Sequence, residues 1–330
     1  MAKPIHPTFH PDPEQMALMP ERSGNDINGR GETGFRRPSK IYWHRPDAIP
    51  HGKIQEWMVN RFNAVEAFES VYAKGDRGPR KPNPVAQNQE QDSPQNWSAR
   101  VKEFALQHEA DLVGVAKFDP KWAYEDCEPS GKPWVIMLGV AMDHARLSQA
   151  PSSDEDTVSA LEVAKQYNRA ARVAAHLANW IRERGYDSVP HGGPWAGPMT
   201  LIPAALACGF GELGKHGSII NKQYGSSFRL SAVVTDMPLV ADEESEFAAD
   251  EFCIRCQVCI NECPVSAIEN DKQFVRGVEK WYVDFDKCIP YFNETHGCGI
   301  CIAVCPWSKP GTAPSLAQKM LRRRERLENQ

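Results

Sequence analysis

The cysteines constrain this chain more than any other feature, because eight of the ten lie between residues 253 and 305. The stretch CIRCQVCINECP places Cys253, Cys256, Cys259 and Cys263 at the spacing C-x2-C-x2-C-x3-C, followed by Pro264. The first three can hold one metal centre, but the fourth cannot easily reach the same one. In two-cluster ferredoxins the fourth cysteine of such a run binds the other iron–sulfur cluster, so the pattern predicts a second run.

The second run lies in HGCGICIAVCPW, where Cys298, Cys301 and Cys305 repeat the C-x2-C-x3-C-P half of the pattern. Cys288, earlier in the chain, supplies the missing cysteine. The spacing therefore predicts two interlocked [4Fe–4S] clusters. The expected ligand sets are Cys253, Cys256, Cys259 and Cys305 for the first cluster, and Cys288, Cys298, Cys301 and Cys263 for the second. A pair of zinc sites is the alternative, although zinc ribbons use two separated C-x2-C pairs rather than interlocked runs.

The two other cysteines, Cys127 and Cys208, stand alone, and we expect each to be a small buried hydrophobic side chain rather than a ligand. The N-terminus, MAKPIHPTFHPDPEQ, lacks a charged start followed by an apolar run. Arg36-Arg37 lies too far into the chain for a twin-arginine signal. Because no apolar run approaches the roughly 18 residues of a membrane span, we expect a cytoplasmic protein whose cysteines bind metal rather than form disulfides.

The pattern divides the chain into an irregular N-terminal arm with one helix (1–95), a core (96–245), a two-cluster ferredoxin-like domain (246–310) and a basic C-terminal helix (311–330). In the core, WSARVKEFALQHEA and VSALEVAKQYNRAARVAAHLANWIRERGY have the apolar spacing of helices. DLVGVAKF, PWVIMLGVAM and RLSAVVTDMPLV are typical of strands. Because helices and strands alternate, we expect an α/β layered core.

A glycine motif in the core invites a misleading interpretation. Gly209, Gly211 and Gly214 spell G-x-G-x-x-G, the nominal dinucleotide fingerprint, which should follow a strand and open a helix. Here TLIPAALAC precedes the motif and reads as helical, and Asp236, the first acidic residue at a suitable distance, lies in a strand-like segment of its own. We therefore do not expect a nicotinamide cofactor, although the glycines indicate main chain that closely approaches some ligand.

The stretch ACGFGELGKHGSIINKQYGSSFRLSAVVTDMPL, together with both cysteine runs, resembles the cobalamin-dependent reductive dehalogenases. ADLVGVAKFDPKWAYE, AKQYNRAA, WYVDFDKCIPYF and CIAVCPW extend the resemblance over roughly residues 97–310. Many ferredoxins share the cysteine runs, so the resemblance to the dehalogenases in particular rests on the blocks that precede them. The related epoxyqueuosine reductases have a GLGWIGK-like segment, whereas this chain has GFGELGKHG. It also has no acidic residue in PHGGPWAGPMTLIPAALA, where that tRNA-modifying family uses one.

The resemblance implies a nitroreductase-like α/β (α+β) core that binds cobalamin, joined to a bacterial-type two-cluster ferredoxin domain. It also implies an oxidoreductase that removes halide from an organic halide, which we expect to be aromatic. In this scheme the clusters deliver single electrons, cobalamin carries the hard chemistry, and the protein supplies position and protons.

Residue by residue, the resemblance gives Tyr167, in AKQYNRAA, the role of proton donor, with Arg229, in SSFRLS, as the basic residue beside it. A cation next to a phenol stabilises the phenolate and eases release of the proton. Without the resemblance, Tyr167 would be interpreted as an ordinary helix-face tyrosine and Arg229 as a surface ion-pair residue. The positions that match cobalamin contacts are Gly211, Gly214, Lys215, His216, Gly217, Tyr224, Gly225 and Ser226.

The sequence carries no flavin and ferredoxin reductase segment of the kind fused to some family members, so we expect electrons from a separate ferredoxin or flavodoxin. The expected partners are that reductant and a small organohalide, without a membrane. At a net charge of −5 there is no reason to expect nucleic acid, and a homodimer is left open. Two alternatives remain: an epoxyqueuosine-reductase-like enzyme that modifies tRNA, and a non-catalytic iron–sulfur electron carrier.

Overall fold

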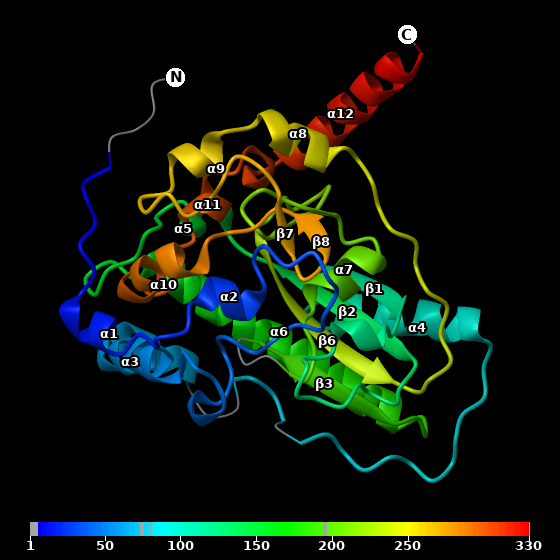
Figure 1. Cartoon of the computed structure of the whole chain (residues 1–330). Helices are drawn as coiled ribbons and strands as arrows, with labels where there is room; N and C mark the ends of the chain where they lie inside the picture. Colours follow the sequence, from blue (N-terminus) through cyan, green and yellow to red (C-terminus); the bar gives the residue numbers. More distant parts are fainter. Residues whose placement is uncertain (1–5, 73–75, 80, 194–196, 330) are drawn as a thin grey trace.

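A four-stranded antiparallel sheet with the strand order β1–β2–β6–β3 forms the centre of the core. Its strands are β1 (Leu112–Lys117), β2 (Trp134–Ala141), β6 (Phe228–Thr235) and β3 (Ser188–Gly192). The computed structural model describes residues 6–72, 76–79, 81–193 and 197–329 (Figure 1). The three strands expected from apolar runs are present, whereas β3 was not predicted.

Helices cover both faces of the sheet. On one face lie α4 (Pro94–Gln107) and α6 (Val158–Arg182), which the apolar spacing predicts, and α7 (Ile202–Ala207) lies on the other. Successive side chains of a strand point to opposite faces, so Ile136 and Leu138 of β2 pack with α4 and α6, while Met137 packs on the side of α7. The predicted mixed α/β (α+β) class is confirmed, with an antiparallel sheet.

The core also contains short elements that connect it to the rest of the chain. They are η3 (Pro120–Trp122), α5 (His144–Leu147) and a hairpin of β4 (Glu212–Leu213) and β5 (Ile219–Ile220). Ile220 of this hairpin packs in one apolar cluster with Phe247 and Trp307. The hairpin therefore lies where the core meets the cysteine-rich domain.

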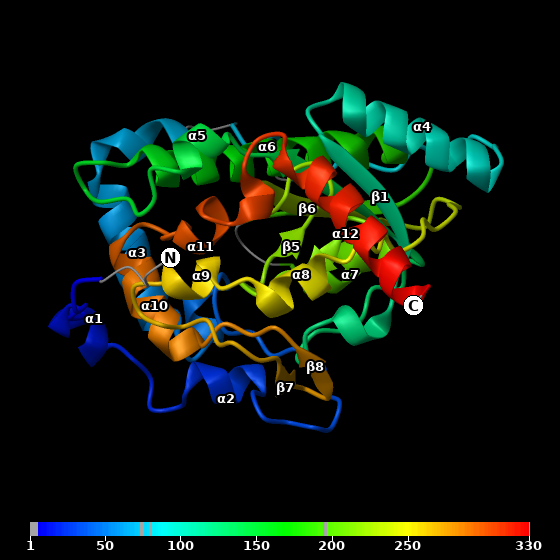
Figure 2. The same ribbon diagram turned by 90° about the horizontal axis from the view of Figure 1, so that it is seen from above.

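The cysteine-rich domain is built from short helices around one small hairpin. Its elements are α8 (Ala249–Arg255), α9 (Val258–Asn261), β7 (Gln273–Val275), β8 (Val278–Lys280), α10 (Phe285–Glu294), α11 (Ile300–Ala303) and η4 (Pro306–Ser308). The chain closes with α12 (Thr312–Glu328), whose Ala313 and Met320 pack with Cys253 and Cys305. The C-terminal end of α12 extends away from the body (Figure 1). Figure 2 shows the same helix from above, lying across α7 and α8 in that view.

The N-terminal arm is more ordered than its composition predicts. It contains α1 (Pro13–Ala17), α2 (Gly24–Asn28), η1 (Pro46–Ala48), α3 (Gly52–Ala64) and η2 (Glu66–Tyr72), not a single helix. Ile54 and Met58 of α3 pack against Ile289 of α10, and both views show the arm along the cysteine-rich domain (Figure 2). The expectation of one helix is met by α3 but misses the other short helices, because polar contacts such as that of Asn25 Nδ2 with Asp284 hold them against a distant part of the chain.

Within the described residues, every helix is too short or too polar to cross a membrane. The division of the chain into four domains stays a prediction.

Candidate active site and cluster centres

The first group of thiols comes from three short elements of the cysteine-rich domain. Cys253 lies in α8, Cys256 ends that helix, Cys259 lies in α9, and Cys305 precedes η4. Burial raises the pKa of Cys253 to about 12, and repulsion from Cys305, Cys259 and Cys256 adds to the rise. Burial, followed by Cys305 and Cys256, likewise raises the pKa of Cys259 to about 12. Repulsion of this kind requires nearby sulfurs, so the four side chains form one group.

The second group joins Cys263 to three cysteines that follow it. Burial raises the pKa of Cys288, in α10, to about 12, with repulsion from Cys298 and Cys263 next in size. Burial also raises the pKa of Cys301, and Cys298, Cys288, Cys259 and Cys263 add to it. Because Cys259 belongs to the first group, the two groups lie next to one another. Across the described chain, no three His, Cys, Asp or Glu side chains converge closely enough to hold one metal ion.

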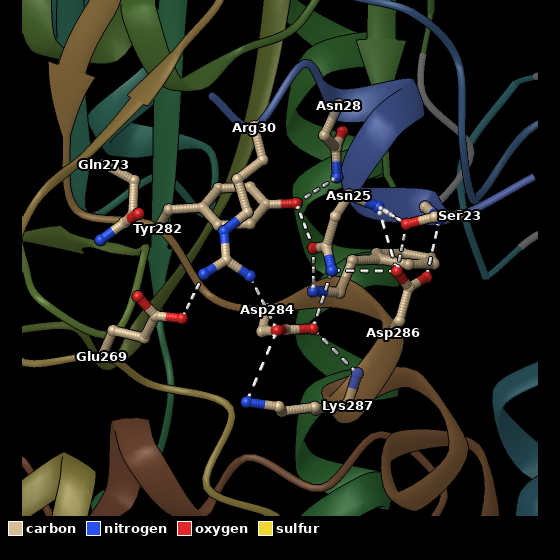
Figure 3. Close-up of polar contacts among 12 residues, drawn as sticks. Ser23, Asn25, Asn28, Arg30, Glu269, Gln273, Tyr282, Asp284, Asp286 and Lys287 are labelled. Atoms are coloured by element: carbon tan, nitrogen blue, oxygen red, sulfur yellow. Dashed lines mark hydrogen bonds and ion pairs between the residues drawn. The ribbon is translucent and has the colours of Figure 1, made fainter. Parts of the chain in front are cut away.

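Polar side chains of the arm hold the helix that carries Cys288 (Figure 3). Asp284 caps α10 by accepting a hydrogen bond from the Lys287 N–H at 3.1 Å, and it accepts others from Asn25 Nδ2 and Arg30 Nη1, each at 2.9 Å. Burial acts to raise the pKa of Asp284, but these hydrogen bonds and the charges of Lys287 and Arg30 hold it below its usual value. The arm is thereby fastened to the second thiol group.

Tyr167 and Arg229 meet across the core. Tyr167 lies in α6 and Arg229 in β6, and the guanidinium carbon of Arg229 lies 5.2 Å from the centre of the Tyr167 ring. Both side chains are half-buried, and Arg229 Nε is buried without a hydrogen-bond partner among the described residues. The pair lines two separate pockets, so it stands in the wall between them.

The first pocket encloses about 890 Å³ of empty space, part of it open to solvent. Its walls are mostly apolar and include Trp43, Met58 and Phe62 of the arm and Phe292 of α10. His296 adds a polar group, because its Nδ1 is buried and has no partner among the described residues. A cavity of this kind, apolar with a few convergent polar atoms, is typical of a small-molecule site.

The second pocket contains about 820 Å³ of empty space, part of it open to solvent, and is lined in large part by the end of β3 and by residues 197–202. A Cβ on Gly193 would lie 2.6 Å from two ring carbons of Tyr167, so only glycine allows this main chain to lie against the tyrosine. His191 also lines the pocket, and burial lowers its pKa to about 4, so it is neutral at pH 7.

The residues predicted to contact cobalamin lie between the core and the cysteine-rich domain. Gly211, Gly214, Lys215, His216 and Gly217 belong to the β4–β5 hairpin and its turn, and Tyr224, Gly225 and Ser226 form the turn before β6. The described linings of the two pockets include none of the eight, although the next residues, Ser218 and Ile219, line the second pocket. Burial lowers the pKa of His216 to about 4, and its Nε2 lies 3.1 Å from Ser226 Oγ.

The glycine motif opens a hairpin rather than a helix. The chain passes from α7 through Gly209 and Gly211 into β4, and the turn at Gly214 returns it as β5. This is not the strand-to-helix geometry of a dinucleotide site.

Of the two lone cysteines, Cys208 is buried, as predicted. The same expectation is wrong for Cys127, which lies half-buried with its Sγ 3.6 Å from an Asp126 carboxylate oxygen. It follows the exposed pair Glu125 and Asp126 in an irregular loop, so the surrounding chain offers it no core.

Several residues that line the two pockets could not be identified from the sequence. His191 and Gly193 reach the site only because the unpredicted β3 pairs with β6. Met58 and Phe62 reach it because α3 packs on α10. The helical spacing of the segment around α3 could have identified its apolar face, but not the surface against which it packs.

Comparisons with known proteins agree with this arrangement. Residues 252–309 match the family model of the 4Fe-4S dicluster domain. The tetrachloroethene reductive dehalogenase of Desulfitobacterium hafniense is 31% identical over 216 residues, which is 61% of this chain and 37% of the relative. That of Sulfurospirillum multivorans is 29% identical over 255 residues, or 63% of this chain and 50% of the relative. The epoxyqueuosine reductase of Vibrio cholerae is 33% identical over 149 residues, or 40% of this chain and 36% of the relative.

Among solved structures, the catabolic reductive dehalogenase NpRdhA in complex with 3-bromo-4-hydroxybenzoic acid shares the fold. It has a TM-score of 0.67 at 23% identity, over 83% of this chain and 40% of that one. A reductive dehalogenase described with a mechanism for B12-dependent dehalogenation has a TM-score of 0.66 at 22% identity, over 84% of this chain and 42% of that one.

The chain spans between about a third and a half of the length of the curated dehalogenases it matches. The sequence match and the shared fold confirm the resemblance that the glycine segment and the cysteine runs predict. The chain is a homologue of the reductive dehalogenases and, over a shorter segment, of the epoxyqueuosine reductases.

Proposed function

We propose that this chain is the catalytic part of a cobalamin-dependent reductive dehalogenase. The observation that carries the proposal is the Tyr167–Arg229 pair, which stands between two pockets in a chain that also holds two adjacent groups of cysteines. The overall reaction takes an organic halide, two electrons and one proton to the hydrocarbon and halide ion. Each of these three inputs has a candidate route in the molecule.

For the electrons, we propose that the two thiol groups hold two [4Fe–4S] clusters. The first would bind Cys253, Cys256, Cys259 and Cys305, and the second Cys288, Cys298, Cys301 and Cys263. Four cysteines per cluster and the exchange of the fourth cysteine between runs are what the motif requires. The adjacency of the groups, through Cys301 and Cys259, supports passage of electrons from one cluster to the other.

The ligand assignment can be tested with Cys263→Ala. If Cys263 completes the second cluster, the variant should lose that cluster and keep the first, whose four cysteines are intact. Iron counting with EPR spectroscopy of the reduced protein measures both. Selective loss of the first cluster would contradict the interlocked assignment.

For the cofactor, we propose that the second pocket is the cobalamin site. Main chain rather than side chains forms much of its wall, at Gly192, Gly193 and Gly197, and Arg229 brings an unpartnered Nε to its edge. Bound cobalamin in a low oxidation state supplies the reducing power that breaks a carbon–halogen bond. We propose that Ser218 and Ile219, with the predicted hairpin and turn behind them, help to hold it.

For the proton, we propose that Tyr167 is the donor and that Arg229 assists it. A guanidinium over the ring stabilises negative charge on the phenol as its proton leaves. The apolar first pocket is the candidate site for the organic halide, and its aromatic side chains favour an aromatic ring. An external ferredoxin or flavodoxin is the proposed electron source. The cytoplasmic location and the homodimer stay predictions.

The proposal is tested by anaerobic reconstitution with iron, sulfide and cobalamin, followed by assay of halide release from bromophenols and 3-bromo-4-hydroxybenzoic acid with titanium(III) citrate. We expect halide release that requires cobalamin. Reconstituted clusters without bound cobalamin would instead indicate an electron carrier. Bound cobalamin without halide release, together with reduction of an epoxyqueuosine-containing tRNA stem-loop, would indicate the tRNA-modifying activity.

A further inference from the structure

Lys215 is a buried cation beside the first thiol group. Only 1% of its surface is exposed, in the turn of the β4–β5 hairpin. Its Nζ donates a hydrogen bond to the main-chain carbonyl of Cys256 at 3.1 Å and lies 3.5 Å from that of Ile254. It also lies 4.9 Å from the centre of the Trp281 ring, a cation–π contact. Because a buried ammonium is costly without partners, this set of contacts fixes the charge at the cysteine-rich domain.

Two different parts of Lys215 contact the same thiol group. Its main chain donates a hydrogen bond to the Cys253 thiol, and its Nζ donates one to the main-chain carbonyl of Cys256. Both contacts bring positive charge close to the sulfurs of this group.

We propose that Lys215 controls where the electron resides. Its buried charge raises the reduction potential of the first cluster above that of the second. The inference rests on the proposed function, because it requires both clusters. It also moves Lys215 from the cobalamin contacts, where the resemblance puts it, to the electron-transfer chain.

The physical basis is the change in cluster charge. One-electron reduction adds a negative charge to a cluster, and charge and hydrogen bonds at its sulfurs set the potential. A buried ammonium is screened little by salt, so it stabilises the reduced form. At the second group the cations Arg30 and Lys287 are both paired with the Asp284 carboxylate, which largely compensates their charge. The first cluster thus takes an electron before the second.

The test is a pair of anaerobic redox titrations followed by EPR, on Lys215→Met and on Lys222→Met. Lys222 is an exposed lysine seven positions later and serves as the matched control. For Lys215→Met we expect the equilibrium constant for reduction of the first cluster to fall about tenfold, which is ~59 mV for a one-electron couple. The second cluster should not shift, and neither cluster should shift in Lys222→Met. A Cys256→Ser variant identifies which EPR signal belongs to the first cluster.

The outcomes separate the inference from the proposed function. Wild-type protein that assembles no [4Fe–4S] cluster would overturn the proposed function. Two clusters with an unchanged first potential in Lys215→Met would overturn only the inference. If Lys215→Met does not assemble the first cluster, Lys215→Gln, which keeps a donor without the charge, replaces it. A lowered potential in that variant supports the inference, and a wild-type potential overturns it.

Discussion

Tyr167 and Arg229 belong to a helix and a strand that are far apart in the sequence, and each is held by its own element. The contact between them is made by the face of the Tyr167 ring, above which the guanidinium carbon lies at 5.2 Å. This is a cation–π arrangement, in which the guanidinium lies over the face of the ring. The proposed proton donor therefore has a cation close to its ring.

Replacement of Tyr167 by phenylalanine tests the proton donor. Tyr167→Phe keeps the ring and the cation–π contact but removes the acidic hydrogen, so the fold and both clusters should remain. We expect dehalogenation to fall about a hundredfold, in the range for loss of a positioned general acid. The measurement is halide release at matched cobalamin content. Wild-type rates would show that the proton comes from elsewhere, and loss of cobalamin would show that the tyrosine packs the cofactor.

Gly193 offers a second test at the same place. A Cβ there would lie 2.6 Å from Tyr167 Cδ1 and Cε1, so Gly193→Ala must displace the ring or the β3 end. We expect a loss of halide release together with a loss of about 1–3 kcal/mol in stability from overpacking. Gly131→Ala is the matched control, because a Cβ at Gly131 would meet nothing within 4 Å. Equal activity in the two variants would mean that the position of the Tyr167 ring does not matter.

At the residue scale, the functional residues that the sequence identifies best are those that recur at a fixed local spacing. The eight cysteines are recognisable because cluster ligands recur at short intervals. The role proposed for Lys215 is not recognisable, since its contacts with Cys256 and Trp281 depend on how the hairpin packs on the cysteine-rich domain. The glycine segment predicts a close approach of main chain, but not to which group.

At the scale of elements, α10 shows how the arm and the cysteine-rich domain depend on each other. The helix begins at a cap, Asp284, that is shared with Asn25 of α2 and Arg30 just after it (Figure 3). Cys288 lies in the first turns of the same helix. The arm, which also lines the first pocket, thus fixes the start of the helix that carries Cys288.

Replacement of Asp284 by asparagine tests this dependence. Asp284→Asn keeps a side-chain cap for α10 but removes the charge that Arg30 and Lys287 face. We expect the free energy of unfolding at pH 7 to fall by about 2 kcal/mol, as for a hydrogen bond to a charged group, and the second cluster to be lost faster to a chelator. Asp271→Asn, at an exposed carboxylate of the same domain, is the control. Chelator loss at the same rate in both variants would contradict the link between arm and cluster.

Helices and strands are predicted correctly from the sequence where apolar periodicity is strong. They are missed where pairing with another strand or packing on another element determines them. The long stripe of α6 and the apolar runs of β1, β2 and β6 predict those elements correctly. β3 reads Ser-Val-Pro-His-Gly and has no such pattern, and it exists because β6 offers it an edge to pair with. The arm likewise lacks periodicity over most of its length, and its helices gain stability from packing on α10.

At the scale of the whole molecule, the proposed reaction needs a source of electrons, and the expected source is a separate ferredoxin or flavodoxin. The G-x-G-x-x-G segment is a hairpin, which offers no helix N-terminus for a pyrophosphate. We therefore expect both clusters to stay oxidised with NAD(P)H alone, and to be reduced when a ferredoxin or flavodoxin with its reductase is added. Visible and EPR spectra measure this. Direct reduction by the nicotinamide would revive Gly209, Gly211 and Gly214 as a dinucleotide site.

The overall class follows from the sequence, because alternating helices and strands predict a layered core and two cysteine runs predict an appended domain. The way in which the parts join does not follow. The first pocket is lined by the arm, by α6, and by the segment with Phe292 and His296, three segments with no shared motif. Their meeting depends on long-range packing, which no local pattern encodes.

The contact between Gly225 and Trp307 connects assembly of the metal centre to the shape of the pocket. A Cβ at Gly225 would lie 2.1 Å from the Trp307 carbonyl oxygen, and the Ser226 N–H donates to Ser308 Oγ at 3.2 Å. Arg229 follows Ser226 by three positions in the same run of chain. If Cys305 is anchored to a cluster as proposed, iron supply affects more than electron flow, because a chain that matures without iron would also lack the support behind Arg229.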